Sequence, residues 1–268
     1  MWVHVLEAST TLVVIISVTA GQRRTQLGPS EPSPVAVDRA EFERRLAVWR
    51  QYVNRRFDEL PAARRFASHM PERDAILYDN KPFRDLVALG PQAIPFFVEE
   101  VQHSSTLAWA LMEITKWRGR LIREGDTRVK PIVYLEEFPD LRGQTYIATG
   151  RIWSYWWETG RKKIPEVFER FYKDWQAKKN AGDDVGAKER YQRMIDLGIV
   201  ALPCMVAKVQ EGDRELIPAI VELSGGELPR AADAAAVRAW WPRKREEIRI
   251  LIEPDASTTQ ATSAPAPP

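Results

Sequence analysis

The chain has very little cysteine and histidine. Among its 268 residues, Cys204 is the single cysteine, and His4, His69 and His103 are the histidines. One cysteine excludes an intrachain disulfide. None of these residues forms an HExxH or CxxC motif, so we expect no metal and no cofactor. Cys204 lies on the apolar side of an expected helix with no histidine near it in sequence, which predicts an inert thiol.

Excess charge of either sign is also missing. The sequence holds 39 basic and 37 acidic residues, a formal net charge of +2. A dedicated nucleic-acid binder usually presents a strongly basic face, so we expect no nucleic-acid partner. Two local basic clusters, Arg161-Lys162-Lys163 and Arg243-Lys244-Arg245, are interpreted as solvated helix faces.

Sequence motifs for catalysis are absent as well. There is no G-x-S-x-G element and no P-loop. Carboxylates occur in adjacent pairs, but neighbours on a helix diverge by about 100° and cannot flank one bond. Glu136-Glu137 is the pair that lies in an insert, about 118–143, between the repeated elements described below, where a functional loop is possible. We therefore expect a protein that is not an enzyme, and we keep Glu136 and Glu137 as candidate binding residues.

The most apolar stretch lies near the N-terminus. Thr11–Ala20 reads TLVVIISVTA, which is too short to span a bilayer alone. Val18-x-Ala20 resembles a signal-peptidase site, so residues 1–20 are interpreted as a signal peptide, although Met1–Ser9 contains no lysine or arginine. An uncleaved anchor and a wrongly assigned start codon are the alternatives. We expect export to the periplasm or cell envelope, with a cytoplasmic or membrane-anchored location as the alternative and membrane contact only through an uncleaved N-terminus.

Polar segments flank the body of the chain. Residues 21–35 are rich in proline, serine and polar residues and are expected to form a flexible linker. Residues 253–268 have no apolar periodicity and are expected to be a disordered tail. The folded body is therefore 36–252. Its first helix is expected to begin after the N-cap residue Asp38 and to end before Pro61. The apolar face of that helix has spacings of three and four: Phe42, Leu46, Trp49, Val53, Phe57 and Leu60.

A segment of this body occurs twice. Residues 83–102 (FRDLVALGPQAIPFFVEEVQ) resemble 191–210 (YQRMIDLGIVALPCMVAKVQ). Unrelated segments of this length share about one or two identities, so common structure is favoured. The glycine in each copy is expected to end one helix and the proline to begin the next. The identical pairs are Leu89/Leu197, Gly90/Gly198, Ala93/Ala201, Pro95/Pro203, Val98/Val206, Val101/Val209 and Gln102/Gln210.

Two further elements follow each copy. An amphipathic helix comes first, with Leu107, Leu111 and Ile114 answering to Leu216, Ile220 and Leu223. A tryptophan-rich helix comes next, and 151–164 resembles 237–248. In the first copy an insert, about 118–143, separates these two elements. Its β-prone stretch Val129–Leu135 predicts a short strand or hairpin in an otherwise helical chain.

The pattern L-G-x-x-A-[IL]-P-x-x-V-x-x-V, followed by a second amphipathic helix, resembles the HEAT-repeat family of α-solenoids. The resemblance covers 83–115 and 191–224. It implies an all-α fold in which helical pairs stack and leave a surface for binding other proteins. Because the insert interrupts the repeats, we expect an irregular HEAT-like helical-repeat stack rather than a long regular superhelix.

Tryptophan is abundant, with ten residues. These large aromatic side chains commonly pack between helices, and this is the simpler interpretation. The alternative is that some rings line a binding groove. The candidate binding surface comprises Trp153, Trp156, Trp157, Trp240, Trp241, Glu136 and Glu137. We expect a protein–protein interaction scaffold with an unidentified protein partner; the alternative is a binding module for a small ligand, glycan or peptide in a tryptophan-rich groove.

Overall fold

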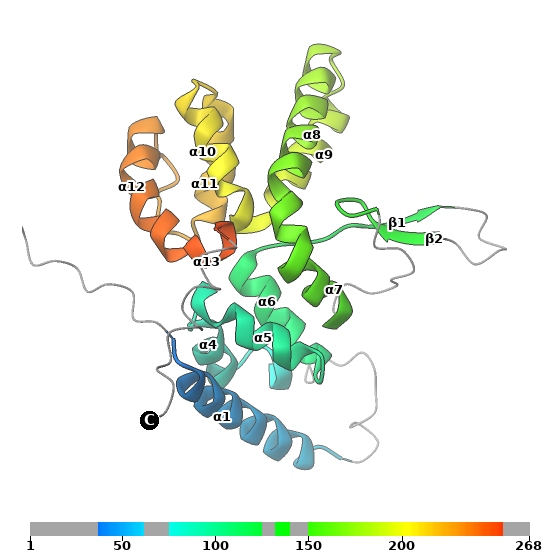
Figure 1. Cartoon of the computed structure of the whole chain (residues 1–268), viewed down its shortest axis with the longest axis vertical. Helices are drawn as coiled ribbons and strands as arrows, with labels where there is room; N and C mark the ends of the chain where they lie inside the picture. Colours follow the sequence, from blue (N-terminus) through cyan, green and yellow to red (C-terminus); the bar gives the residue numbers. More distant parts are fainter. Residues whose placement is uncertain (1–36, 62–74, 125–131, 140–149, 254–268) are drawn as a thin grey trace, which may run out of the picture. The chain divides into compact units, whose positions relative to one another are not determined.

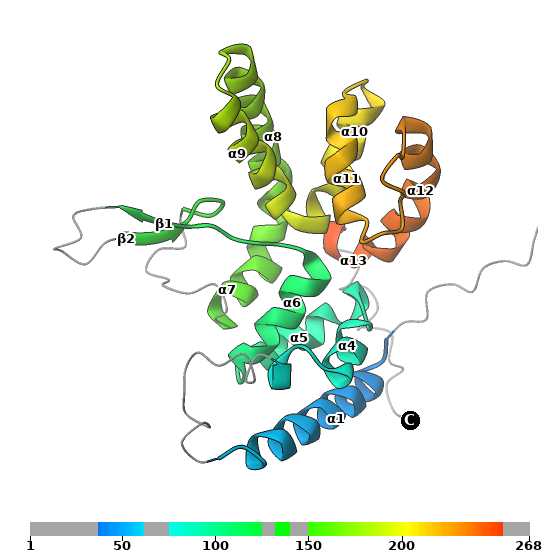
Figure 2. The ribbon, with the colours of Figure 1, turned by 180° about the vertical axis from the view of Figure 1, so that it is seen from behind.

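The computed structural model describes residues 37–61, 75–124, 132–139 and 150–253. This part of the chain is mostly helical (Figures 1 and 2), as predicted. Residues 1–20, 21–35 and 254–268, which carry the predicted signal peptide, linker and tail, lie outside it. The helices are α1 (Arg39–Asp58), α4 (Lys81–Val87), α5 (Ile94–Val101), α6 (Ala108–Thr115), α7 (Gly150–Tyr155), α8 (Arg161–Asn180), α9 (Asp184–Asp196), α10 (Leu202–Gln210), α11 (Ile217–Leu223), α12 (Ala234–Glu247) and α13 (Arg249–Ile252).

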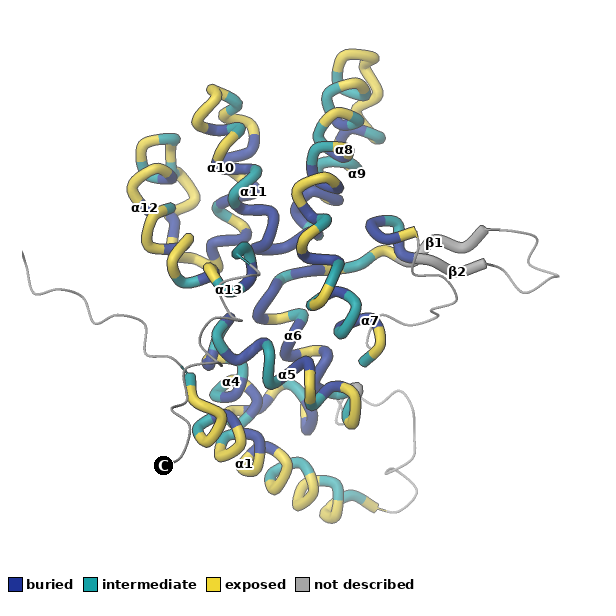
Figure 3. The backbone as a smooth tube through the Cα atoms, in the orientation of Figure 1, coloured by how far each residue is buried: buried dark blue, intermediate teal, exposed yellow. Residues whose placement is uncertain are grey.

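Helix α1 begins where the sequence predicts. The Asp38 side chain accepts a hydrogen bond from the Glu41 amide at 2.6 Å, which satisfies one of the free donors of the first turn. The helix ends at Asp58, three residues before Pro61. Phe42, Leu46 and Trp49 of its apolar face are buried, whereas Val53, Phe57 and Leu60 are half-buried. The helix packs against α4, and the Trp49 indole N–H donates to the carbonyl of Leu77, just before α4, at 3.1 Å. Figure 3 shows the opposite side of α1 exposed along its length.

The duplicated segments adopt matching local structure. Gly90 and Gly198 have φ of +69° and +76°, a left-handed conformation that glycine adopts at little cost. Pro95 and Pro203 lie in the first turns of α5 and α10, where the missing N–H leaves no bond unmade. Equivalent apolar positions are buried in both copies: Ile94/Leu202, Phe97/Met205, Val98/Val206 and Val101/Val209.

The two copies meet at the second glycine. A Cβ added to Gly198 would lie 2.2 Å from the Thr115 carbonyl oxygen and 2.6 Å from the Trp117 amide nitrogen. The Arg118 amide donates to the Asp196 carbonyl at 2.7 Å in the same region. The end of α6 therefore packs directly on the backbone that links α9 to α10, a close approach that only glycine permits.

The insert contains the predicted strands. Strand β1 (Leu121–Glu124) pairs antiparallel with β2 (Ile132–Leu135), and Leu121 lies opposite Leu135. Residues 125–131 and 140–149 lie outside the described part of the chain. After β2, Phe138 enters an aromatic cluster with Trp117, Trp153 and Trp156. The insert is thus attached to the helical core by its aromatic side chains.

A π-helical turn, Trp156–Gly160, joins α7 to α8. Gly160 allows this turn to pack closely, because an added Cβ would lie 2.9 Å from the Phe138 ring. Helices α8 and α9 lie side by side in both views (Figures 1 and 2), and the rings of Tyr172, Trp175 and Tyr191 contact one another between them. No helix among residues 37–61, 75–124 and 150–253 is long and apolar enough to cross a membrane.

Candidate functional site

Two of the predicted surface tryptophans lie in the core. Trp153 and Trp156 are fully buried, and their ring centroids lie 5.1 Å and 5.9 Å from that of Trp117. The prediction that these two residues contribute to a binding surface is wrong. Their rings close the junction between the first copy and α7, because burying so large an apolar area stabilises that contact.

Glu136 and Glu137 lie in an ion cluster with α9. Arg193 donates to Glu136 at 3.1 Å, to Asp196 at 2.8 Å and to the fully buried carboxylate of Glu137. Burial raises the pKa of Glu137, and the nearby Arg193 guanidinium opposes that rise. These carboxylates therefore fasten the insert to α9. The interpretation of the pair as exposed binding groups is wrong for Glu137 and is not favoured for Glu136, which Arg190 also contacts.

The three remaining tryptophans have different surroundings. The buried Trp240 donates its indole N–H to Glu227 at 2.9 Å, which fixes α12 to the turn after α11. Trp157 is half-buried, and the Arg161 guanidinium lies 3.9 Å from its ring centroid. Trp241 is half-buried and faces a cleft. Of the candidate tryptophans, Trp241 thus lines this cleft directly. Trp157 contacts Arg161, which also lines it.

This opening, which we call the C-terminal cleft, lies where α8, α10, α12 and α13 meet. Its volume is about 470 Å³, within the usual range of ligand sites. Apolar groups from all four elements are combined with cationic groups from α8 and α12. The lining residues are Arg161, Lys162, Pro165, Val200, Pro203, Cys204, Trp241, Arg245, Leu251, Ile252 and Glu253.

Arg161 connects the elements that form the wall of the cleft. Its buried guanidinium donates to the carbonyls of Ile250 at 2.8 Å and Leu251 at 3.2 Å, and to the carbonyl of Trp157. It therefore joins the π-helical turn and α8 to the C-terminal helix α13. The prediction that residues 161–163 form a solvated face is wrong for Arg161, because its donors are satisfied by buried backbone acceptors. The same prediction for 243–245 is wrong for Lys244, which is buried against Glu227 and Glu247.

The charge around the cleft is positive. Lys162 and Arg245 are exposed at its rim. Glu253 is the only carboxylate among the described lining residues, and Arg245 donates to it at 3.0 Å. Cys204 is half-buried in the wall, and burial raises the pKa of its thiol to about 11, so the thiol is neutral at physiological pH. This rise in pKa agrees with the prediction of an unreactive cysteine.

The position that lines the cleft in the second copy is covered in the first copy. The residue equivalent to Cys204 is Phe96, whose ring centroid lies 5.5 Å from that of Phe42 in α1. Arg39 of α1 also lies over the Phe96 ring at 5.1 Å. In the first copy, the Phe96 ring and helix α1 thus cover this position. In the second copy, the same position opens into the cleft. The sequence signal for the cleft is this exchange of phenylalanine for a small residue.

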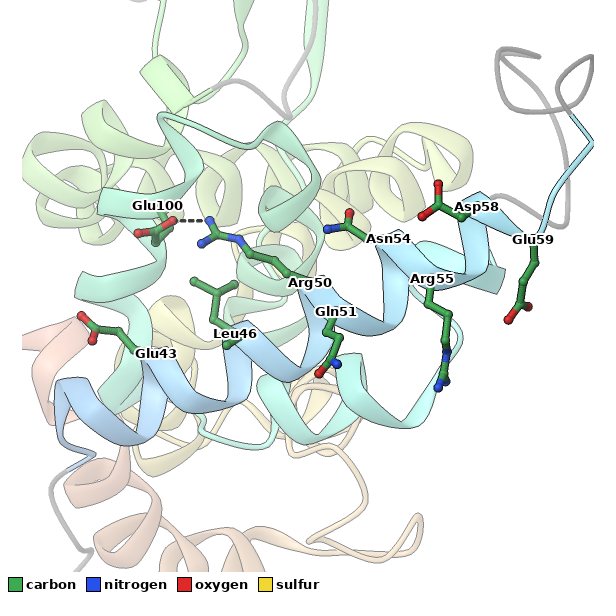
Figure 4. A pocket seen from close by; sticks show the side chains of 10 residues that line it. Glu43, Leu46, Arg50, Gln51, Asn54, Arg55, Asp58, Glu59 and Glu100 are labelled. Carbon is green, nitrogen blue, oxygen red and sulfur yellow. Dashed lines mark hydrogen bonds and ion pairs between the residues drawn. The ribbon is translucent and has the colours of Figure 1, made fainter.

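A second opening, of about 940 Å³, lies along α1. Figure 4 shows Gln51, Asn54, Arg55 and Asp58 projecting from that single helix, with Arg50 reaching toward Glu100 of α5. Arg50 and Glu100 form an ion pair at 2.6 Å. Eight of the ten residues that line this trough are polar or charged, and nine of them come from α1 and the residue after it, so the trough is more open than the C-terminal cleft, which four elements enclose.

The C-terminal cleft has the chemistry of a binding site. It offers apolar area, an aromatic ring and cations, and its one described carboxylate is already paired with Arg245. Among the described residues, no group of three histidine, cysteine or carboxylate side chains is placed to hold a metal ion. Comparisons of the chain with protein-family models, with curated proteins and with solved structures found no match.

Proposed function

We propose that this protein is a non-catalytic scaffold of HEAT-like stacked helical pairs that binds another protein. The observation that carries the proposal is the C-terminal cleft, which combines an apolar floor with a positive rim. An apolar side chain of a partner would bury against Leu251 and Trp241, as anchor residues do in protein interfaces. An acidic neighbour in the same segment would pair with Lys162 at the rim. We also propose that this partner lies in the cell envelope, in keeping with the signal peptide interpreted in residues 1–20.

Rim charge affects the rate of association and its salt dependence more than the final affinity. Binding through this cleft is therefore expected to slow as ionic strength increases. Lys162 and Arg245 supply this attraction, whereas the buried Arg161 acts on the structure of the wall.

A second candidate function is the binding of a small amphiphilic anion in the same cleft. The volume of about 470 Å³ favours it, because this space accepts a small molecule without rearrangement. The two candidates differ in how much of the surrounding surface is covered. A partner protein would also cover residues on α8 and α12 outside the cleft, whereas a small ligand would not.

The test is crosslinking of the tagged full-length protein in its own cells, with the crosslinked positions read by mass spectrometry. The decisive variant is Cys204→Phe, which places in the cleft the side chain that the first copy carries at the equivalent position. Ala207→Phe adds the same ring at an exposed position of α10 that does not line the cleft and is the matched control.

A stoichiometric partner crosslinked around the cleft, lost in Cys204→Phe and kept in Ala207→Phe, is the expected result. Equal capture by both variants would show that the cleft is not the partner site. Cleft protection by a small molecule with no protein crosslinked there would favour the second candidate.

A further inference from the structure

The π-helical turn Trp156–Gly160 lies between the insert and the C-terminal cleft. On one side, Phe138 of the insert packs on Gly160, where an added Cβ would lie 2.9 Å from the ring. On the other side, the next residue, Arg161, donates to carbonyls of α13 and lines the cleft. One short turn thus contacts both the insert and a residue in the wall of the cleft.

The hydrogen bonds of this turn involve the Arg161 side chain. In a regular α-helix, the Arg161 amide would donate to the carbonyl of Trp157, four residues back. Here it donates to the Trp156 carbonyl, five residues back, which is the π-helical pattern. The Trp157 carbonyl instead accepts from Nε of the Arg161 side chain at 2.5 Å. The guanidinium therefore takes the place that the backbone amide has in a regular helix.

The same guanidinium fixes the wall of the cleft. Its Nη1 donates to the carbonyls of Ile250 at 2.8 Å and Leu251 at 3.2 Å, and its central carbon lies 3.9 Å from the centroid of the Trp157 ring. If the turn changed to a regular α-helix, the Arg161 amide would take the Trp157 carbonyl, and Nε would lose this acceptor. The guanidinium would then shift, and its bonds to α13 would be disturbed.

The aromatic packing at this junction leaves polar groups unpaired. The indole N–H groups of Trp117, Trp153 and Trp156 are buried and have no hydrogen-bond acceptor within the described part of the chain. A buried donor without an acceptor lowers stability, whereas contact with water would satisfy it. A looser junction thus loses apolar contact but gains hydrogen bonds for these donors. The packed and loosened arrangements therefore lie closer in free energy than in a core whose donors are all satisfied.

We propose that the insert regulates the C-terminal cleft through this turn. While Phe138 packs on Gly160, the turn stays π-helical and the Arg161 guanidinium holds α13 in the wall of the cleft. When the insert is displaced, the turn changes its hydrogen bonds and α13 loosens. Arg161 is the positioning residue of this link, because its side chain bonds both the turn and α13. The inference rests on the proposed function of the cleft, since it concerns how that site is controlled.

Cys204 reports on this link. It is the single cysteine of the chain and lines the cleft together with Leu251 and Ile252 of α13. The rate at which iodoacetamide alkylates its thiol, measured on the full chain without a partner, therefore depends on how closely α13 covers the cleft. Phe138→Ala removes the ring that packs on the turn and is expected to speed alkylation by about tenfold. Phe42→Ala removes an equally buried ring from α1, at the same 1% exposure, and is the matched control.

A double variant tests the route. Arg161→Met removes the bonds to α13 and is expected to speed alkylation as Phe138→Ala does. If the insert acts through Arg161, adding Phe138→Ala to Arg161→Met should change the rate by less than about twofold. Effects that multiply in the double variant, no effect of Phe138→Ala, or an equal effect of Phe42→Ala would overturn the proposal.

The reverse direction is tested without any substitution. Coupling between two sites is reciprocal, so a bulky group placed in the cleft is expected to loosen the insert. The unaltered protein is labelled at Cys204 with a bulky maleimide and followed by hydrogen–deuterium exchange. Faster exchange at 135–138 and 156–160, with α5 unchanged, is the expected result. No change at these two segments, or an equal rise in α5, would contradict the coupling.

These tests are separate from the test of the scaffold function. None of them uses a partner protein, so their failure leaves the proposed binding at the cleft standing. Conversely, failure to capture a partner would not affect the measured link between the insert, Arg161 and Cys204.

Discussion

The ion cluster between the insert and α9 permits a sharp prediction. Arg193 and Glu137 have side-chain exposures of 5% and 0%, and they face each other across the junction. Arg193→Met removes the guanidinium but keeps a chain of similar length. The substitution leaves the Glu137 carboxylate buried, with the Arg120 amide still donating to it at 3.3 Å and the Glu136 carboxylate beside it.

We expect Arg193→Met to lose much stability, because it leaves the buried charge of Glu137 without its ion-pair partner. Removing one partner of a buried ion pair typically costs about 3–5 kcal/mol. For a domain of this size, that loss lowers the melting temperature by roughly 6–20 °C. Glu137→Gln is expected to be milder, because Arg193 keeps Glu136 and Asp196 as partners. The double variant should recover part of the loss, since it removes both buried charges.

The pH dependence supplies an independent check. Burial raises the pKa of Glu137, and without Arg193 this pKa is expected to rise further. A carboxyl whose folded-state pKa lies above its unfolded value stabilises the fold most at low pH, and this contribution is lost as the pH rises through the folded pKa. The stability deficit of Arg193→Met should therefore be larger at pH 8 than at pH 5.

Chemical denaturation at the two pH values measures these differences. Glu189→Gln is the control, because the Glu189–Arg120 pair is 49% and 43% exposed and its loss should change stability by less than about 1 kcal/mol. The argument fails if Arg193→Met loses no more than this control. It also fails if the deficit is the same at both pH values, because the buried charge would then not be its cause.

Three further predictions concern the cleft and the repeats. With a pKa of about 11, the Cys204 thiol should be alkylated at pH 8 on the order of a hundredfold more slowly than free cysteine. Gly90→Ala should lower the free energy of unfolding by about 1 kcal/mol, because alanine is strained at a positive φ. Gly198→Ala should lower it by about 3 kcal/mol more, because the added Cβ also clashes with the Thr115 carbonyl, and thermal unfolding measures both losses. Asp213→Ala should lower the free energy of unfolding by about 1–2 kcal/mol, because Asp213 caps the 3-10 turn Arg214–Leu216 that leads into α11 and accepts a hydrogen bond from Tyr172.

Local signals predicted much of the fold. The spacing of Phe42, Leu46 and Trp49 identified α1, and the Asp38 cap placed its start. The repeated glycine and proline placed the boundaries of α5 and α10, because each residue acts on its own backbone. These features depend on contacts within a few residues, which sequence patterns report directly.

The site was harder to predict because its contacts are not local. Arg161 donates to carbonyls 89 and 90 residues further along the chain. The run of basic residues at 161–163 therefore gave no sign that Arg161 is buried and connects distant segments. Adjacent Trp240 and Trp241 have separate roles because neighbouring side chains on a helix point in different directions. The burial of Glu137 depends on Arg193, which becomes its neighbour only after the insert packs on α9.

The two copies also show why a repeat motif says little about the place of binding. Residues shared by both copies, such as Pro95 and Pro203, shape the helices and are equally compatible with an open or a filled surface. Phe96 and Cys204 occupy equivalent positions, yet one ring packs on α1 and the other side chain lines a cleft. The proposed binding at the cleft therefore depends on positions where the copies differ. Because a duplicated framework keeps its backbone signals while single side chains change, comparison of the copies with each other is the most direct guide to the functional surface.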